Sequence, residues 1–300
     1  MLAAAQADHR DLPVSAPPEI DPGLPFVAPV IRTDKVTSTF GPRWKPNEQR
    51  FDFHRGVDFY GALHDPVFAA ADGEVHRIYR EGNRVYPNGG NTLIVRHELN
   101  SPFPLHGHRI EQVFSVYLHL ADFEVEQGQT VAAGQRVAGM GRSGNTVFTH
   151  LHFEVRLQTT CSLEYQRKNP RAQCAGYGFD PHVHPFLFLQ RPPAEAGEAP
   201  FKLSHAPGAP FVLQYEARNT KLDLNELRCD LGVLNFNLRT GIDATTTGRL
   251  DHFDFGWVSM YPGRFSGRND SIAYLFEFPE QPKFVQVTDI HGRGLRREFR

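Results

Sequence analysis

The chain has 300 residues, of which 40% are hydrophobic and 22% charged, and its formal net charge is -2 at pH 7. It is long enough for two hydrophobic cores. The near-zero charge gives no basic surface of the kind that nucleic-acid binding uses, and no run of about eighteen apolar residues is present that would cross a bilayer as a helix. With 26 Gly and 23 Pro, the composition is typical of a mostly β protein.

Residues 1 to 32 are predicted to form an extended arm, because they are rich in Ala, Pro and Asp. Within them Ala5-Gln6-Ala7 resembles the cleavage site of an export signal. The basic and long apolar stretches that should precede such a site are missing. We therefore expect either a truncated export signal or an accidental match.

An imidazole and a carboxylate flank a glycine in the next informative segment. His54 and Asp58 are residue types that bind zinc, and Gly56 allows the backbone to bend between them. Taken alone, such a pair is more often a surface turn or a local ion pair. Further along, the aromatic and β-branched run 114–120 predicts a strand that ends near His119, where a single histidine is usually a packed or capping side chain.

The segment His150-Leu151-His152-Phe153-Glu154 has the alternation of a strand. Its two histidines project from one face, about 7 Å apart along the strand, so they can converge on one metal ion. No cysteine lies near, and three nitrogen or oxygen ligands with a fourth position left to water are typical of a catalytic zinc. The 15 histidines also give H-x-H at His106/His108 and His182/His184, but neighbouring prolines predict solvated loops there.

The ordered series of these motifs resembles the lysostaphin-type (LytM-like) zinc endopeptidases of bacterial cell walls. The likeness covers roughly residues 36 to 188. Four further strings look like the family's, the first as an opening strand and turn and the second as a hairpin: Thr37-Ser38-Thr39-Phe40-Gly41-Pro42-Arg43, Pro66 to Val75, Gly90 to His97, and Gly128 to Gln135.

The resemblance implies that His54, Asp58 and His152 bind Zn²⁺ and that His119 and His150 form an unligated catalytic pair. Some relatives have lost these ligands and act only as binding modules or activators, so retention of all five favours an enzyme. Thr149 departs from the family, which commonly has proline or a small residue there. The implied fold is an antiparallel, duplicated β-sandwich over residues 33–190, and a faint repeat between Val67 to Val75 and Val131 to Val137 agrees with a duplicated hairpin.

Zinc held by two imidazoles and one carboxylate keeps a positive charge, so it would lower the pKa of a bound water and polarise a carbonyl. His119 and His150 would then accept and donate the protons of the reaction, since the chain has no H-E-x-x-H motif whose glutamate could act as the base. Glu154 is expected either to fix the tautomer of a zinc-binding histidine or simply to pair with Arg156. His97 is expected to be structural.

The expected function is a zinc-dependent endopeptidase that hydrolyses amide bonds in peptidoglycan stem-peptide cross-links. A D-alanyl to diaminopimelate bond is preferred over a glycine bridge, although no residue separates these substrates. The alternatives are a non-catalytic wall-binding or hydrolase-activating module, and secreted action on a competitor's wall or on host protein. A periplasmic or secreted location follows from the family's site of action, which favours a truncated or mis-called export signal over an accidental match at Ala5-Gln6-Ala7.

Relative to the family, residues 158–179 look like an insertion that contains Cys161 and Cys174. In an exported protein these cysteines are expected to form a disulfide worth about 2 to 4 kcal/mol, whereas in a cytosolic protein two free thiols are expected. Cys229 is predicted to be a small buried residue.

The Pro-rich stretch 190–200 is predicted to be a linker to a second domain. Alternating segments at 233–238 and 284–289 predict a small antiparallel sandwich over 200–300, whose last hairpin resembles that of an immunoglobulin-like domain. Its aromatic residues are expected to be mostly core, with an exposed patch for glycans or envelope proteins as the alternative. They are Tyr215, Phe253, Phe255, Trp257 and Tyr261.

Overall fold

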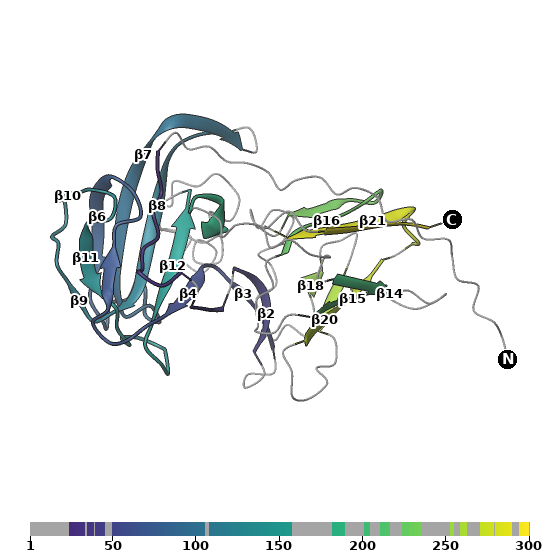
Figure 1. Cartoon of the computed structure of the whole chain (residues 1–300), viewed down its shortest axis with the longest axis horizontal. Coiled ribbons are helices and arrows are strands. Elements are labelled where there is room, and N and C mark those ends of the chain that lie inside the picture. The colour runs from purple at the N-terminus through teal and green to yellow at the C-terminus, as the bar shows by residue number, and fades with distance from the viewer. Residues whose placement is uncertain are drawn as a thin grey trace. The chain divides into compact units, whose positions relative to one another are not determined.

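A computed structural model describes the chain in fourteen segments and divides it into two compact units (Figure 1). The first unit comprises the described residues of 24–40 and 54–189, and the second those of 41–53 and 201–299. Across the described residues the regular structure is strand, apart from one 3-10 turn, η1 (Pro185–Leu187). The segments are 24–33, 35–38, 40–45, 50–105, 108–157, 182–189, 201–204, 211–216, 224–235, 253–254, 259–262, 271–278, 280–289 and 294–299.

An eight-stranded antiparallel sheet forms the body of the first unit. Its strands run in the order β1-β4-β12-β8-β7-β6-β10, and β13 also pairs with β12. In Figure 1 the neighbouring strands β12, β8, β7 and β6 can be followed side by side. The bounds are β1 (Val36–Ser38), β4 (Val57–Tyr60), β6 (Gly73–Tyr79), β7 (Asn91–Leu105), β8 (His108–Leu120), β10 (Thr130–Val131), β12 (His150–Arg156) and β13 (His182–Val183).

Strand β12 carries the two histidines of the His150-Leu151-His152 segment. Its apolar residues Leu151, Phe153 and Val155 are fully buried on one face, so His150, His152 and Glu154 must point to the other. The strand is paired on one side with β4 and on the other with β8. The predicted strand at this position is therefore confirmed, and its histidines are held between two neighbouring strands.

A three-stranded sheet, in the order β5-β11-β9, completes the first unit. It consists of β5 (Pro66–Phe68), β11 (Arg136–Gly139) and β9 (Asp122–Phe123). The predicted hairpin over 66–75 is wrong, because β5 pairs with β11 and β6 pairs with β10. The two strings of the faint repeat thus pair with each other instead of folding back on themselves.

The described end of the predicted N-terminal arm is an irregular segment that packs on the first unit. Its Phe26 and Val30 side chains are buried. Two backbone hydrogen bonds join it to the chain around β5, from Val27 N to the Ala70 carbonyl at 2.7 Å and from Phe68 N to the Pro29 carbonyl at 2.9 Å. We call residues 24–33 and 35 the strap.

The second unit contains a five-stranded sheet, β14-β15-β20-β19-β18, a four-stranded sheet, β17-β16-β21-β22, and the two-stranded β2-β3. The predicted strand at 284–289 is β21, and the first half of the predicted strand at 233–238 is β17, whereas residues 236–238 lie outside the described residues. Cys229 is buried, as expected. The bounds are β2 (Gly41–Lys45), β3 (Arg50–His54), β14 (Phe201–Ser204), β15 (Phe211–Glu216), β16 (Leu224–Cys229), β17 (Val233–Asn235), β18 (Phe253–Asp254), β19 (Ser259–Pro262), β20 (Ser271–Glu277), β21 (Phe284–Asp289) and β22 (Gly294–Glu298).

Several sequence predictions lie outside the described residues. They are the arm up to residue 23, the 158–179 insertion with Cys161 and Cys174, the linker 190–200, and the side chains of the second-unit aromatics. The all-β, antiparallel class is confirmed for the described residues of both units. The immunoglobulin-like character of the second unit and the domain limits 33–190 and 200–300 stay predictions.

Candidate metal centre and active site

Three side chains from different parts of the chain meet on one face of the large sheet. Asp58 on β4 and His152 on β12 are direct partners in the antiparallel register, so their side chains emerge side by side. His54 is the last residue of β3. The bend at Gly56, between β3 and β4, brings its side chain to the same point. A Cβ atom on Gly56 would lie 2.4 Å from the Phe153 carbonyl oxygen, so the close approach of this bend to β12 requires glycine.

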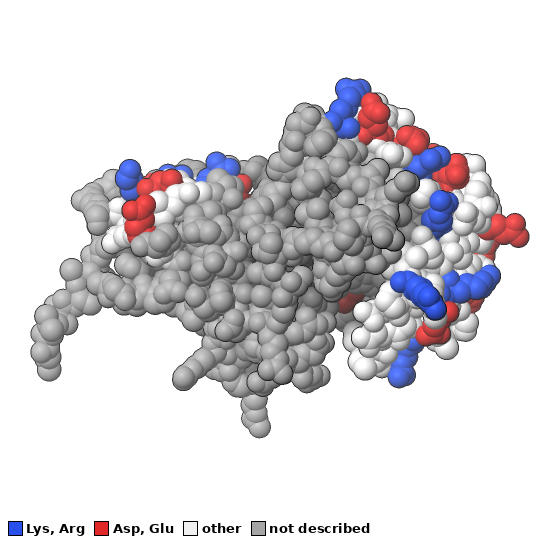
Figure 2. Space-filling view, turned by 180° about the vertical axis from the view of Figure 1, so that it is seen from behind, with Lys and Arg blue, Asp and Glu red and all other residues white. Residues whose placement is uncertain are grey.

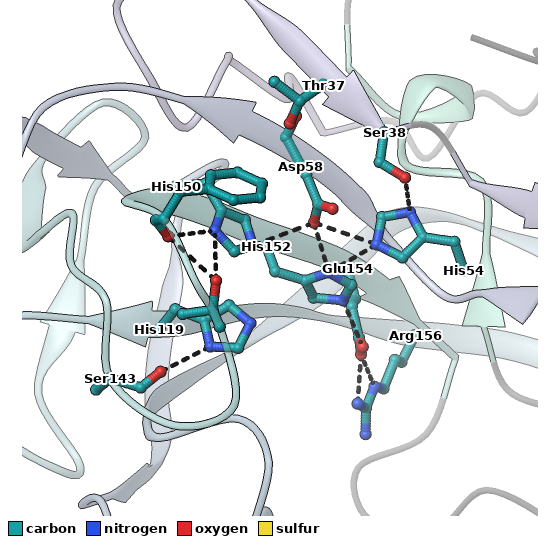
Figure 3. A network of polar contacts seen from close by, with 12 residues as sticks. Thr37, Ser38, His54, Asp58, His119, Ser143, His150, His152, Glu154 and Arg156 are labelled. Atoms are coloured by element: carbon teal, nitrogen blue, oxygen red, sulfur yellow. Dashed lines mark hydrogen bonds and ion pairs between the residues drawn. The ribbon is translucent and has the colours of Figure 1, made fainter. Parts of the chain in front are cut away.

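The three side chains turn one potential ligand atom each toward a common centre (Figure 3). His54 Nε2 lies 3.1 Å from Asp58 Oδ1, and His152 Nδ1 lies 2.8 Å from the same oxygen. The two nitrogens are 3.0 Å apart. His54 and Asp58 are buried and His152 is nearly so, so the cluster is largely shielded from solvent.

The donor set fits a zinc ion. Four ligand atoms at zinc-bond lengths of about 2.0 to 2.2 Å around a tetrahedral ion are about 3.3 Å from one another, close to the separations observed. The other ring nitrogens are already engaged, His54 Nδ1 with Ser38 Oγ at 3.2 Å and His152 Nε2 with Glu154 Oε1 at 3.0 Å. Such outer partners fix ring orientation and leave the inner nitrogens for a metal.

The electrostatics of the cluster also suit a cation. Burial raises the pKa of Asp58, but the charge of His54 and hydrogen bonds from His152 and His54 outweigh it and hold the pKa well below its ordinary value. Burial lowers the pKa of His152, but its hydrogen bonds to Asp58 and Glu154 outweigh that effect and raise the pKa to about 9. Without metal, a proton on His152 therefore occupies the position that a cation would take.

His119 and His150 lie next to this cluster, and the centroids of their rings are 4.8 Å apart. His119 Nδ1 donates to the Ser143 carbonyl at 2.8 Å, and His150 Nδ1 donates to the Phe148 carbonyl at 3.1 Å. Because a carbonyl can only accept, each neutral ring must carry its proton on Nδ1 and a lone pair on Nε2. The Nε2 atom of His150 lies 3.7 Å from Asp58 Oδ1, so this lone pair faces the candidate metal position.

Burial, and the charges of His152 and His150, lower the pKa of His119 to about 4. At neutral pH this imidazole is therefore a base rather than an acid. Its backbone has φ 63, a left-handed conformation that is uncommon outside glycine and often marks functional positions. A hydrogen bond from His119 N to the Gly89 carbonyl at 2.9 Å holds this turn.

The loop that supports His119 is fixed by close backbone contacts. Gly90 has φ +65, and a Cβ atom there would lie 2.4 Å from the Ser143 carbonyl carbon. Asn91 N donates to Ser143 Oγ at 2.9 Å, and Gly144 N donates to Glu81 Oε1 at 2.7 Å. Sequence reasoning missed Ser38, Ser143 and Phe148, and the last two act through backbone carbonyls that have no side-chain signature.

Glu154 fulfils both roles that the sequence left open. One carboxylate oxygen accepts from His152 Nε2, and the other accepts from Arg156 Nε. Arg156 in turn donates to the Tyr86 hydroxyl at 2.6 Å. Burial raises the pKa of Glu154, but the charges of Arg156 and His182 and its hydrogen bonds hold the pKa well below the ordinary value. His152 is therefore hydrogen-bonded to a buried charged network formed by Glu154 and Arg156.

Two sequence predictions about other histidines have different outcomes. The interpretation of His182 and His184 as solvated is wrong, because both are buried, and His182 Nε2 lies 3.4 Å from Glu154 Oε2. The flanking prolines, Pro181 and Pro185, exclude a long strand at this position. They do not exclude β13, a strand of only two residues that pairs with β12. His97 is buried and bonded to the Asp72 carbonyl and to Ser115 Oγ, as a structural residue would be. His106 and the side chain of His108 lie outside the described residues.

All five side chains expected from the sequence, His54, Asp58, His119, His150 and His152, are thus brought together. The strand arrangement and this cluster define an antiparallel β domain with three potential metal ligands and two further imidazoles beside them. Residues 52–163 match Peptidase family M23, and the chain therefore carries a domain of that family.

Named relatives match between two fifths and one half of the chain. Peptidoglycan DD-endopeptidase ShyB of Vibrio cholerae is 35% identical over 122 residues, which are 40% of this chain and 25% of that protein. Murein hydrolase activator NlpD of Salmonella dublin is 29% identical over 166 residues, 50% of this chain and 40% of that protein. The crystal structure of a zinc-containing peptidase from Vibrio cholerae is 33% identical, with a TM-score of 0.35, over 44% of this chain and 36% of that one. The chain thus spans about a quarter of the length of the curated endopeptidase that it matches.

Proposed function

We propose that this protein is a zinc-dependent endopeptidase that hydrolyses amide bonds in peptidoglycan cross-link peptides. The observation that carries the proposal is the convergence of His54, Asp58 and His152 next to two histidines whose Nδ1 protons are both held by backbone carbonyls. Three nitrogen or oxygen ligands leave a position for water and substrate. A purely structural metal would have no use for two further imidazoles beside it.

Zinc bound by His54, Asp58 and His152 would polarise the scissile carbonyl and lower the pKa of a water molecule. The protein's own residues do the rest. His119 and His150 accept a proton at Nε2, since their Nδ1 atoms are occupied. Once protonated, they hydrogen-bond the developing oxyanion and return a proton to the leaving amine. Glu154 and Ser38 hold the rings of His152 and His54 in place throughout.

The preferred bond is the D-alanyl to diaminopimelate cross-link. Support comes from the relatives named as DD-endopeptidases, which match about two fifths of the chain. The test is to digest purified walls with diaminopimelate cross-links and walls with glycine bridges, and to identify the released muropeptides by mass. Release of monomers from the first wall type alone supports the proposal, and release only from glycine-bridged walls contradicts the preference.

A second candidate is a wall-binding or hydrolase-activating module. It is favoured by the match to murein hydrolase activator NlpD, which covers half of this chain. Retention of all five site residues supports the enzyme instead. A zinc-loaded protein that is inert on every wall, but increases the rate of another wall hydrolase, would establish the activator. Cleavage restricted to foreign walls or to host protein would indicate secreted action.

Action on the wall places the proposed site of work in the periplasm or outside the cell. Among the described residues no helix is long and apolar enough to span a membrane. In the face shown in Figure 2, basic and acidic side chains are interspersed over the described surface. The substrate partner proposed is the peptidoglycan stem peptide, and envelope proteins are proposed to contact the 200–300 domain.

A further inference from the structure

A cavity of about 360 Å³ lies where the strap meets the end of β4. Its walls combine apolar side chains with two cations, Arg32 and Lys35, and one carboxylate, Asp65. The lining is therefore mostly apolar with a net positive charge. The lining residues are Val30, Ile31, Arg32, Lys35, Tyr60, Gly61, Ala62, Asp65, Pro66 and Met140.

Tyr60 connects this cavity to the candidate active site. It is the direct partner of His150 in the β4–β12 register, so the two side chains emerge on the same face. Asp58, two residues earlier on β4, points to that face as well, about 7 Å away along the strand. A peptide bound over the metal position and continuing along β4 would therefore reach the cavity within about two residues, since an extended chain advances about 3.3 to 3.6 Å per residue.

Backbone contacts hold the strap segment that carries Arg32 and Lys35 in place. The Tyr60 amide donates to the Lys35 carbonyl at 2.8 Å, which fixes Lys35 against the end of β4. Buried Val30 anchors the strap just before Arg32. The Asp65 carboxylate accepts the Ala62 amide at 2.7 Å, and the Asp65 carbonyl accepts the Met140 amide at 2.8 Å. The Asp65 carboxylate is thus hydrogen-bonded within the lining that it shares with Arg32 and Lys35.

We propose that this cavity is a subsite for the carboxylate of a diaminopimelate residue close to the scissile amide, with Arg32 and Lys35 as its cationic partners. The inference rests on the proposed function and extends it to substrate choice. A charged carboxylate gains charge-assisted hydrogen bonds from guanidinium and ammonium groups. A glycine bridge has no side-chain carboxylate to place there, so the strap selects between the two wall types.

The test compares two cross-linked peptide dimers that differ only in whether the diaminopimelate carboxylate is free or amidated. For the zinc-loaded full chain, we expect kcat/KM to be about 10-fold higher for the free form, mainly through KM, because an exposed charge-assisted bond contributes to binding of ground and transition states alike. The double variant Arg32→Gln/Lys35→Gln should lose this preference and keep kcat. The matched control Arg77→Gln/Arg109→Gln removes the same charge from exposed positions outside the cavity and should keep it.

Binding provides a readout that does not depend on cleavage. Uncross-linked stem tetrapeptide, free or amidated, is titrated into wild type and both variants by calorimetry. Equal wild-type affinity and kcat/KM for the two forms, or an undiminished preference in Arg32→Gln/Lys35→Gln, overturns the subsite and leaves the proposed function standing. A protein that cleaves no wall, yet binds the free peptide through these cations, overturns the proposed function and retains the subsite.

Discussion

At the scale of single residues, different hydrogen bonds distinguish the two candidate bases from the candidate metal ligands. His119 and His150 each donate Nδ1–H to a carbonyl, whereas His152 donates Nε2–H to a carboxylate and turns Nδ1 inward. In the proposed function the same side-chain type would serve two chemical roles, and the tautomer imposed by each neighbour would decide which.

Replacing either base should remove catalysis and leave zinc in place. We expect His119→Ala and His150→Ala each to lower kcat by about 10²- to 10⁴-fold, the usual contribution of a positioned acid or base, with zinc still bound one to one. Metal analysis and single-turnover kinetics on purified walls measure both quantities. His64→Ala, at an exposed histidine, is the control and should change neither. Loss of zinc in either variant would indicate that the replaced histidine is a zinc ligand.

Glu154 should control metal affinity through His152. Glu154→Gln keeps the shape but removes the charge that orients the ring, so zinc affinity should fall by about 10- to 100-fold. Competition against a chromogenic chelator measures this. The exposed Glu111→Gln serves as the control. Unchanged affinity in Glu154→Gln would mean that Glu154 only neutralises Arg156.

Zinc binding should release a proton near neutral pH. The pKa of His152 is raised from 6.5 to about 9 in the metal-free fold, so between these values the ring is protonated and zinc must displace that proton. Calorimetry in two buffers of different ionisation enthalpy should give about one proton per zinc at pH 7.5 and a smaller number as pH rises above 9.

The same shift has a consequence for the metal-free protein. A pKa raised by folding stabilises the fold below the unfolded value of 6.5, and this contribution is lost as pH rises through about 9. Proton release near zero at pH 7.5 would contradict both statements.

At the scale of elements, the sharp bend between β3 and β4 positions His54 against Asp58 and His152. A Cβ atom on Gly56 would meet the Phe153 carbonyl oxygen at 2.4 Å and His152 Nε2 at 2.8 Å. β4 and β12 would have to move apart, and these strands carry two of the three candidate ligands.

Gly56→Ala should therefore destabilise the fold by about 1 to 3 kcal/mol, the usual cost of overpacking, and also abolish zinc binding. The control is Gly82→Ala, at φ +83 with nothing within 4 Å of the added atom. That variant should cost about 1 to 2 kcal/mol of backbone strain and keep zinc. Denaturant unfolding with and without zinc distinguishes the two, and a Gly56→Ala protein that binds zinc normally would contradict the steric argument.

At the scale of the whole molecule, zinc should stabilise only the unit that contains the site. Because a ligand that binds the folded state alone stabilises it by mass action, zinc should slow amide hydrogen exchange in β4 and β12. The strands β16 and β21 of the second unit serve as the internal control and should exchange at unchanged rates. Protection spread evenly over both units, or none in β12, would contradict the site's location.

Much of the first unit was predictable because its signals are local. The alternation of Leu151, Phe153 and Val155 predicts β12, and the spacing of His150 and His152 places both on one face. The cross-pairing of β5 with β11 and of β6 with β10 was not predictable, since each string is equally compatible with a local hairpin. The burial of His182 and His184 was missed because a two-residue edge pairing leaves almost no pattern.

By itself, the sequence determined the all-β class, the strand that presents His150 and His152, and the five residues of the candidate site. The tertiary structure alone decided which ring nitrogen of each histidine faces inward, because that depends on the carbonyls of Ser143 and Phe148 and on Glu154. It also placed Arg32 and Lys35 beside Tyr60. Backbone carbonyls and long-range packing have no signature in a single sequence, since every residue has the same backbone and contact partners are fixed only when the chain folds.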